Sequence, residues 1–366
     1  MTDKIWEAPL FSTPGLDIAC IMDAFSKPCA SMLIPLLCLL LMPPFSGSAR
    51  GWDNITFSLE NDQFANRNSD KYYTHGAKLT WISSCLPDRD NSFRPPWRRP
   101  FFDRILPAEG NAPRFGSFAL AQIIYTPLEL NQNDPDGTDR PYAGFSYFSA
   151  GIHRVSFHKL DSLEITVGLV GRHSYAEDIQ KTFHKWINSA EPMGWQNQLH
   201  DEPVLNVSFD RKWKIFQKEF SGLGIDLIPR AGVSIGNALT EAGAGAQIRF
   251  GWHLPDDFGT YPIMFGSESN VPGNQPPAAE SRGRFGANLF LGANGHAVLR
   301  NIFLDGNTFR DSHSVDKRHF VADYIGGIVV IVKKVKISYS YVSRSKEFKT
   351  QIKNQHFGSV SVAFSW

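Results

Sequence analysis

Hydrophobic and polar residues alternate with a period of two along several segments of the chain, most clearly at its C-terminus. The last segment has an aliphatic or aromatic face and a face of small residues: Val360, Val362, Phe364 and Trp366 against Ser359, Ser361, Ala363 and Ser365. The same alternation recurs at residues 335–341 and 55–60. Segments of about ten residues with this pattern are typical of transmembrane barrel strands, whose small and polar positions face a polar lumen.

Twelve such segments follow one another along the chain. We place them near residues 53–61, 74–84, 115–125, 143–156, 162–171, 203–216, 223–235, 241–253, 283–304, 318–332, 335–345 and 355–366. An even count allows both ends of the barrel to lie in the periplasm. The predicted fold class is therefore all-β: one antiparallel transmembrane β-barrel of about 12 strands, formed by residues 50–366, with a short helix in an extracellular loop.

The direction of the first strand decides which connections face the cell exterior. If that strand runs outward, parity gives six exterior connections: 62–73, 126–142, 172–202, 236–240, 305–317 and 346–354. The remaining connections then face the periplasm. Two of these, 85–114 and 254–282, are long and rich in Pro, Gly and charged residues.

The apolar run at residues 30–42 is too short to span a bilayer and is followed by Pro43 and Pro44. Lys27 precedes it, and residues 47–49 offer small side chains for cleavage, so we predict that residues 1–49 are a signal peptide cleaved after Ala49. The first 21 residues are unusual for a signal, and translation starting at Met22 fits better. A buried core helix is the alternative interpretation of this run.

Composition narrows the class of protein further. Hydrophobic residues make up 42% and charged residues 20% of the chain, which excludes a disordered chain and a helical membrane protein. Three of the four cysteines lie in the predicted signal, so Cys85 remains alone and no intramolecular disulfide is expected. Removing residues 1–49 takes away two basic and four acidic residues, which moves the net charge only from +1 to +3. We therefore expect no nucleic-acid partner.

The first cluster of chemically active residues joins the ends of the first two predicted strands, at residues 60–64 and 70–76. Alternation places Asp62 with the inward residues of the first strand and Thr74 with those of the second, Lys78 and Thr80. An acid and a hydroxyl at paired strand ends suit a hard cation such as Ca²⁺. The alternative is a hairpin loop in which Asn61 and Asp62 only support a turn.

The segment 171–188 predicts a helix inside an exterior loop. Ser174 and Glu177 form a capping-box pattern. Apolar residues then repeat at helical spacing: Ile179, Phe183, Trp186 and Ile187. We expect this stripe to pack on the barrel rim or in the lipid headgroup region. Gln180, His184 and Asn188 line another face, where a neutral imidazole can activate water as a general base. A structural or surface role for His184 is the alternative.

Other enzymatic motifs are missing from the sequence. It contains no Gly-x-Ser-x-Gly elbow at a strand–helix turn, no paired Cys and His zinc signature and no phosphate-binding Gly-rich loop. Arg140, in a predicted exterior loop, can bind a phosphate through two hydrogen bonds or can be an ordinary surface residue.

Taken together, these segments resemble the outer-membrane lipid A 3′-O-deacylases, the LpxR family. The resemblance covers most of the chain after residue 49 and rests on the order and spacing of seven segments: 60–62, 72–76, 122–127, 139–144, 171–184, 194–198 and 301–306. It implies a twelve-stranded barrel in the outer membrane and a Ca²⁺-dependent ester hydrolysis at the extracellular leaflet. The substrate implied is lipid A of lipopolysaccharide.

By motif position, the resemblance implies that His184 is the general base, that Asp62 is a carboxylate of the calcium site, and that Asn61 and Thr74 are polar groups of the catalytic site. Where a characterised member of the family has a functional lysine, this chain has Gln132, so substrate contacts can differ.

Basic residues on the predicted exterior loops suit the phosphates of lipid A, and we expect Arg140, Arg172 and Lys181 to bind the substrate. The C-terminal Trp366 is expected to be recognised by the machinery that inserts barrels into the outer membrane. A porin-like barrel without catalytic activity and an outer-membrane phospholipase with Ser–His chemistry remain the alternatives.

Overall fold

The structure, a computed structural model, describes residues 53–65, 71–83, 112–134, 136–156, 158–187, 191–266, 268–273 and 285–366. These residues all belong to one compact unit, residues 46–366. The predicted signal peptide, with Met22, and Cys85 lie outside the described residues.

The described strands match the twelve predicted segments within a few residues at each end, and one short strand is added after the sixth. They are β1 (Asn54–Asn61), β2 (Tyr72–Ile82), β3 (Arg114–Thr126), β4 (Ala143–Ser156), β5 (Lys159–Val170), β6 (Glu202–Trp213), β7 (Phe216–Phe220), β8 (Leu223–Gly236), β9 (Leu239–Trp252), β10 (Phe285–Asn301), β11 (Phe320–Val332), β12 (Val335–Arg344) and β13 (Gln355–Ser365).

The helical elements are short. They are η1 (Asp62–Phe64), η3 (Arg172–Ser174), α4 (Ala176–Ile187), η4 (Trp195–Asn197) and α6 (Ile302–Asp305). None of the helices in the described ranges is long and apolar enough to cross a membrane.

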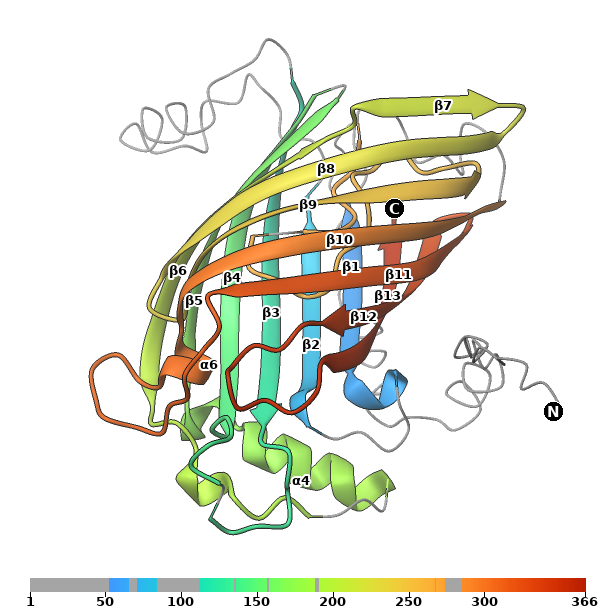
Figure 1. Ribbon diagram of the computed structural model, residues 1–366. Helices are drawn as coiled ribbons and strands as arrows, with labels where there is room; N and C mark the ends of the chain where they lie inside the picture. Colours follow the sequence, from blue (N-terminus) through green and yellow to red (C-terminus); the bar gives the residue numbers. More distant parts are fainter. Residues whose placement is uncertain are drawn as a thin grey trace, which may run out of the picture. The chain divides into compact units, whose positions relative to one another are not determined.

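Antiparallel pairing runs without interruption around a ring of strands (Figure 1). β1 pairs with β13 and with β2, and β6 pairs with β8, which closes the ring. The short β7 pairs with the first half of β8 while β6 pairs with the second half, so β7 continues β6 rather than adding a strand to the circumference. The described residues therefore form a closed barrel of twelve strands, as predicted.

Alternation along the strands gives the barrel an apolar outer surface and a polar interior. Ser338 and Ser361 are buried inside the ring and their hydroxyls are 2.6 Å apart, whereas Ile337 and Val362 are about two-fifths exposed on the outside. The outer surface also carries stacked aromatic rings, with Phe118 stacked on Trp81 and on Phe148. Apolar residues outside and polar residues inside are the arrangement of a barrel that crosses a bilayer.

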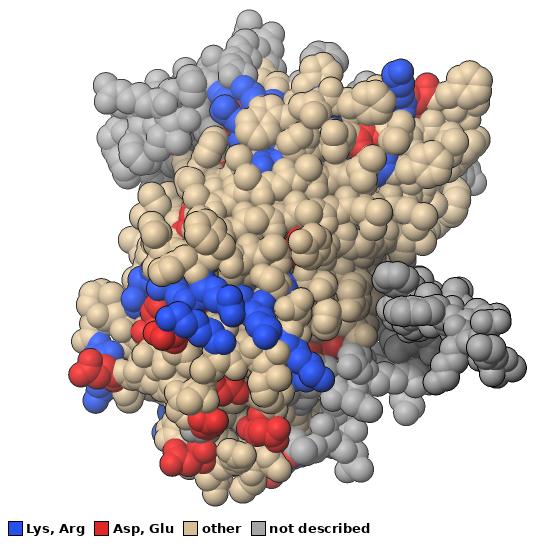
Figure 2. All heavy atoms as spheres, viewed as in Figure 1, with Lys and Arg blue, Asp and Glu red and all other residues tan. Residues whose placement is uncertain are grey.

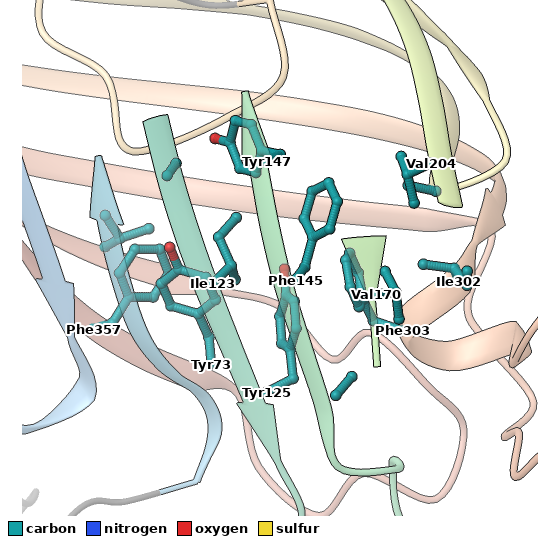
Figure 3. Packing of buried hydrophobic residues seen from close by; sticks show 14 of the residues in the cluster. Tyr73, Ile123, Tyr125, Phe145, Tyr147, Val170, Val204, Ile302, Phe303 and Phe357 are labelled. Atoms are coloured by element: carbon teal, nitrogen blue, oxygen red, sulfur yellow. The ribbon is translucent and has the colours of Figure 1, made fainter. Parts of the chain in front are cut away.

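The elements η1, α4 and α6 all lie at one end of the barrel, which we call the loop rim (Figure 1). Inside the barrel near this rim is a cluster of aromatic and aliphatic side chains that includes Tyr73, Tyr125, Phe145, Tyr147 and Phe357 (Figure 3). This cluster fixes which residues of β3 and β4 point inward. The residues that alternate with them must point out of the barrel.

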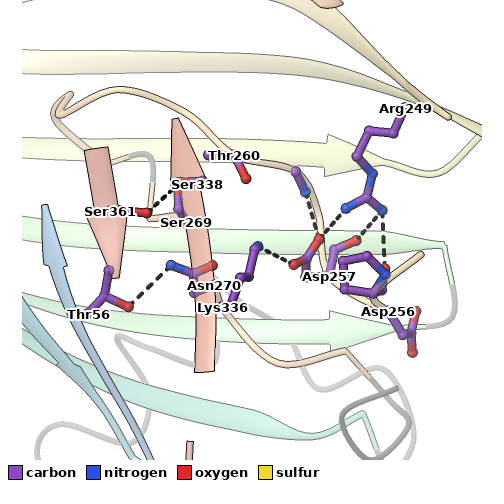
Figure 4. Close-up of polar contacts among 12 residues, drawn as sticks. Thr56, Arg249, Asp256, Asp257, Thr260, Ser269, Asn270, Lys336, Ser338 and Ser361 are labelled. Carbon is purple, nitrogen blue, oxygen red and sulfur yellow. Dashed lines mark hydrogen bonds and ion pairs between the residues drawn. The ribbon is translucent and has the colours of Figure 1, made fainter. Parts of the chain in front are cut away.

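Residues 254–273, which we call the inner loop, connect β9 to the segment before β10. Its residues bind the inward-facing side chains of strands around the ring. Ile263 donates its backbone N–H to Glu60 of β1 at 2.7 Å, and Gly266 donates to Glu164 of β5 at 3.0 Å. Asn270 donates to Thr56 at 3.2 Å (Figure 4).

The inner loop also supplies the acidic partners of buried basic residues. Asp257 forms ion pairs with Arg249 and Lys336 (Figure 4), and Glu268 forms one with Lys78 of β2. The sequence predicted residues 254–282 as a periplasmic connection. The described part follows the end of β9 opposite the loop rim and folds back into the barrel, which the sequence did not predict. Buried charges need partners, and the inner loop supplies one to each of Lys78, Arg249 and Lys336.

Candidate functional site

At the loop rim, β1 ends in Asn61, and Asp62 begins η1. The Asn61 side chain accepts a hydrogen bond from the backbone N–H of Gln63 at 2.8 Å, and Asp62 accepts one from the backbone N–H of Lys71 at 2.6 Å. Asp62 is only 1% exposed. Both side chains thus support the turn, which was the alternative interpretation of this motif. These contacts also fix a buried carboxylate at the rim.

Thr74 lies in a β-bulge, which the alternation in the sequence did not predict. Tyr73 pairs with Tyr125 and His75 pairs with Ile124, so Thr74 is the extra residue of β2. Its hydroxyl is 2.6 Å from that of Thr126, and both residues are buried. The bulge interrupts the period of two between Tyr73 and His75. Thr74 is buried like Gly76, Lys78 and Thr80, so its place in their inward set stays a prediction.

The helix α4 lies against the outside of the barrel wall. Ala176, its first residue, packs in one buried cluster with Ile124 of β3 and with Tyr142 and Trp195. The carbonyl of Ser174, two residues earlier, accepts hydrogen bonds from Gln122 at 2.7 Å and Ser146 at 2.8 Å. Gln122 and Ser146 alternate with inward-facing residues of the inner cluster, so they point out of the barrel.

The buried face of α4 is the polar one. Ala176, Gln180 and His184 follow one another at intervals of four residues and are 1%, 3% and 3% exposed. The Gln180 side-chain oxygen accepts a hydrogen bond from the indole N–H of Trp195 at 2.8 Å. The sequence did not predict this contact, although Trp195 lies in a segment that contributes to the family resemblance.

The apolar face of α4 points away from the wall. Ile179 is 45% and Trp186 54% exposed, and Phe183 is partly exposed. The stripe therefore does not pack on the barrel rim, which was one of the two predicted locations. The lipid headgroup region remains the predicted location.

The start of α4 also differs from the predicted capping box. The Ser174 hydroxyl donates to the carbonyl of Gly171, and Glu177 pairs with Lys181 at 2.8 Å. Neither side chain makes the reciprocal backbone contact of a capping box with the residues described. The turn before α4 is held by Asp201, which accepts hydrogen bonds from the backbone N–H and the ring of His173 at 2.9 and 2.6 Å. Although slight burial opposes it, these bonds hold the pKa of Asp201 below its usual range.

The three predicted substrate-binding residues lie in different environments. Arg140 is fully buried, where it pairs with Glu347 at 2.9 Å and lies 4.3 Å from the centre of the Tyr125 ring. This burial corrects the prediction of a surface arginine, because the ion pair and the ring stabilise its charge inside the rim. Arg172 is exposed, and Lys181 is partly exposed. The latter two can therefore reach a phosphate at the surface.

A shallow, open apolar groove of about 530 Å³ lies on the outer wall between β2 and β5, on the apolar outer surface of the barrel. Its outward-facing lining is mainly aliphatic and aromatic: Ala77, Leu79, Leu120, Gln122, Ser146, Phe148, Val167 and Leu169. Gln122 and Ser146 are also the residues that bind the Ser174 carbonyl. The groove thus extends along the wall to the start of α4.

The donor set suits a hard cation only in part. In the described portion of the chain, no three His, Cys, Asp or Glu side chains come close enough to hold a metal ion. Asp62 is buried at the rim together with Asn61 and Thr74, whose amide and hydroxyl oxygens are neutral donors. Oxygen donors are the kind that Ca²⁺ takes, and fewer charged ligands give weaker sites. A weak calcium site around Asp62 is therefore compatible with these residues.

Comparisons with known proteins agree with this architecture. The family described as "Outer membrane protein LpxR" matches residues 33–366. Among solved structures, LpxR from Salmonella typhimurium matches with a TM-score of 0.68 and 17% sequence identity, covering 85% of this chain and 99% of that one. At this identity the structural likeness shows the fold alone.

Two autotransporter barrels match more weakly. The Bordetella autotransporter Brka β-domain has a TM-score of 0.39 at 7% identity, covering 86% of this chain and 99% of its own. The translocator domain of NalP from Neisseria meningitidis has a TM-score of 0.34 at 10% identity, covering 95% of this chain and 99% of its own. A search of curated proteins gave no match.

Proposed function

The chain belongs to the family of the outer membrane protein LpxR, and from this membership we propose that it is a lipid A 3′-O-deacylase. The proposed reaction is hydrolysis of the ester that carries the 3′-linked acyloxyacyl group. We further propose that residues 1–49 are the signal peptide and that Trp366 is recognised by the barrel-insertion machinery. The loop rim then faces the cell exterior.

One observation carries the proposal: α4 holds a polar face against the outside of the barrel wall rather than over the lumen. His184 and Gln180 are buried on this face, and the apolar groove between β2 and β5 begins near the start of the helix. An enzyme that acts on a membrane lipid needs its polar groups on the lipid side of the wall. A groove with aliphatic lining suits an acyl chain.

In the proposed mechanism, His184 takes a proton from water as the water oxygen attacks the ester carbonyl carbon. The bond between that carbon and the sugar oxygen then breaks, and the proton passes to the leaving oxygen, which yields the acyloxyacyl group as a free carboxylic acid and a free sugar hydroxyl. Asn61 and Thr74 are the polar groups that would orient water and substrate. Arg172 and Lys181 would bind lipid A phosphates.

Asp62 is the proposed calcium ligand. When bound there, Ca²⁺ would supply a Lewis acid for the negative charge that develops on the ester carbonyl oxygen. Gln132 is exposed in the loop 127–142, so at this position the substrate meets a neutral amide instead of a lysine.

The interior of the barrel argues against the porin alternative. The inner loop binds β1, β2, β5, β6, β9 and β12 from within the ring. A segment with so many contacts in the lumen narrows any path for solutes. No comparable observation favours the phospholipase alternative.

Purified protein in detergent micelles, given lipid A, tests the proposed reaction. We expect release of the 3′-linked acyloxyacyl chain, loss of activity on chelation, and no inhibition by a serine-directed fluorophosphonate. Inhibition by the fluorophosphonate would instead support Ser–His chemistry. Pore conductance without any change in lipid A would support the porin alternative.

A further inference from the structure

A band of basic residues crosses the loop rim on the side of the barrel formed by β10, β11 and β12. Figure 2 shows Lys and Arg side chains gathered there, over α6 and the loops that follow β10 and β12. Four members, which we call the basic rim patch, are exposed or partly exposed: Arg318, Lys346, Lys349 and Lys353. The loop after β10 begins across the ring from β3 and β4, on which α4 packs. The loop after β12 reaches the β3–β4 loop, where Glu347 pairs with Arg140 and the Thr350 hydroxyl donates to the carbonyl of Thr138.

Carboxylates beside the band, among them Asp305, which pairs with Lys317 at 2.8 Å, offset only part of this charge (Figure 2). Asp316 pairs with Lys349 at 3.1 Å, but both side chains are more than two-thirds exposed, so the pair contributes little. Glu347 is buried and points to Arg140. Among the residues that the structure describes, no ion pair involves Arg318, Lys346 or Lys353.

Backbone contacts hold the two loops of the patch together. Arg318 donates its backbone N–H to the carbonyl of Glu347 at 2.7 Å, and Lys349 donates to the carbonyl of Asp316 at 2.9 Å. Lys317 and Phe348 form a β-bridge between the same loops. The charged side chains therefore project from an ordered support, which lowers the entropy lost when they bind a ligand.

Apolar side chains adjoin the patch on the side of the strands. Leu299, Phe320 and Tyr324 are 74%, 80% and 62% exposed, and Phe320 follows Arg318 by two residues. Basic groups directly beside an exposed apolar surface match an amphiphile with an anionic head and acyl tails. Lys and Arg bind phosphate oxygens through charge-assisted hydrogen bonds.

We propose that the basic rim patch is a second, non-catalytic binding site for the phosphate groups of the glycolipid in the outer leaflet. This inference rests on the proposed function, which places the loop rim at that leaflet. The site would hold one glycolipid molecule on the side of the barrel formed by β10, β11 and β12. It would thereby anchor the barrel in the glycolipid layer independently of catalysis.

The test compares the full chain with a triple variant, Arg318→Gln, Lys346→Gln and Lys353→Gln. A matched control carries Lys218→Gln, Lys333→Gln and Lys334→Gln, which removes the same charge at the opposite end of the barrel. Native mass spectrometry in detergent counts the bound molecules of bisphosphorylated lipid A, dephosphorylated lipid A and phosphatidylglycerol, with His184→Ala in every protein to prevent turnover.

We expect the parent and the control each to bind two lipid A molecules. The triple variant should bind the second molecule with an affinity at least about tenfold lower. Dephosphorylated lipid A should also lose the second site. The inference is overturned if the triple variant retains both molecules, or if phosphatidylglycerol fills the second site equally well.

A separate measurement distinguishes this inference from the proposed function. With His184 intact, the triple variant should release the acyloxyacyl chain from lipid A in micelles within about twofold of the parent rate, because the three changed residues are surface charges that make no contact with the proposed catalytic residues. If the parent releases no acyloxyacyl chain while the triple variant still fails to bind a second lipid A molecule, the proposed function is wrong and the proposed binding site is supported.

Discussion

His184 and Gln180 are polar residues buried on the outside of a membrane barrel. Burying a polar group without hydrogen-bond partners costs free energy, so a buried polar face on α4 needs partners. Trp195 satisfies the Gln180 oxygen. For His184, the role we propose is activation of water.

Replacing His184 with Ala or Asn should lower deacylation by about 10²–10⁴-fold, the usual contribution of general-base catalysis. Activity of the unaltered protein should also fall toward acid pH as the imidazole takes up a proton. Assays of fatty acid release from lipid A measure both effects. The exposed neighbour Lys185, changed to Ala, is the control and should leave the rate nearly unchanged. A folded His184→Ala protein with the native rate would place the base elsewhere.

Replacing Asp62 with Asn should weaken calcium activation, because it removes one formal charge from a site whose ion prefers carboxylate oxygens. Excess Ca²⁺ should partly restore activity. Titrating activity against free Ca²⁺ tests this, with Asp134→Asn in an exposed loop as the control. If the two variants give the same calcium curve, Asp62 only supports the turn through its bond with Lys71.

At the scale of elements, the position of α4 depends on a close approach to β4. A Cβ added at Gly144 would lie 2.2 Å from both the Ala176 Cβ and the Ser174 hydroxyl oxygen. Only a glycine therefore lets the helix start rest on the wall at this distance.

Gly144→Ala should displace the start of α4 and lower activity about tenfold or more, since small misplacements of catalytic groups are costly. The barrel should still insert and show heat-modifiable migration. Gly295→Ala in β10 is the matched control, because its Cβ would meet nothing nearer than 3.9 Å. Equal activity of the two variants would show that the contact between α4 and β4 does not position the site.

The sequence predicted the helix but not the direction of its faces. Helical spacing identifies an apolar stripe with Ile179 and Trp186 and a polar face with Gln180 and His184. In a soluble protein the apolar face would pack inward. Here it points outward, and which face meets the wall depends on contacts with β3 and β4 that no local pattern encodes. The bulge at Thr74 escaped prediction for a similar reason, because it depends on the register against β3.

At the scale of the whole molecule, period-two alternation was enough to predict the closed ring, because each strand has one apolar face and one polar face. The inner loop was not predictable in this way. Its Asp257 and Glu268 look like residues of a solvated connection, and their partners Arg249, Lys336 and Lys78 are distant in the sequence or on other strands.

Replacing Glu268 with Gln should destabilise the barrel, because it leaves Lys78 buried without its carboxylate. Breaking a buried ion pair in this way costs about 3–5 kcal/mol. In a heat-modifiability assay on gels, the temperature at which the band of the folded barrel disappears should fall measurably. Glu177→Gln, which breaks an exposed pair with Lys181, should shift it little. Equal shifts would mean that the inner loop does not stabilise the ring.

The central claim is that this barrel removes the 3′-linked acyloxyacyl group from lipid A. Mass spectrometry of lipid A from cells with the protein, without it, and with the His184→Ala variant tests the claim most directly. We expect a species lacking that group only where the unaltered protein is present, in cells supplied with Ca²⁺. Identical lipid A in all three cell types, with the protein inserted in the outer membrane and calcium present, would contradict it.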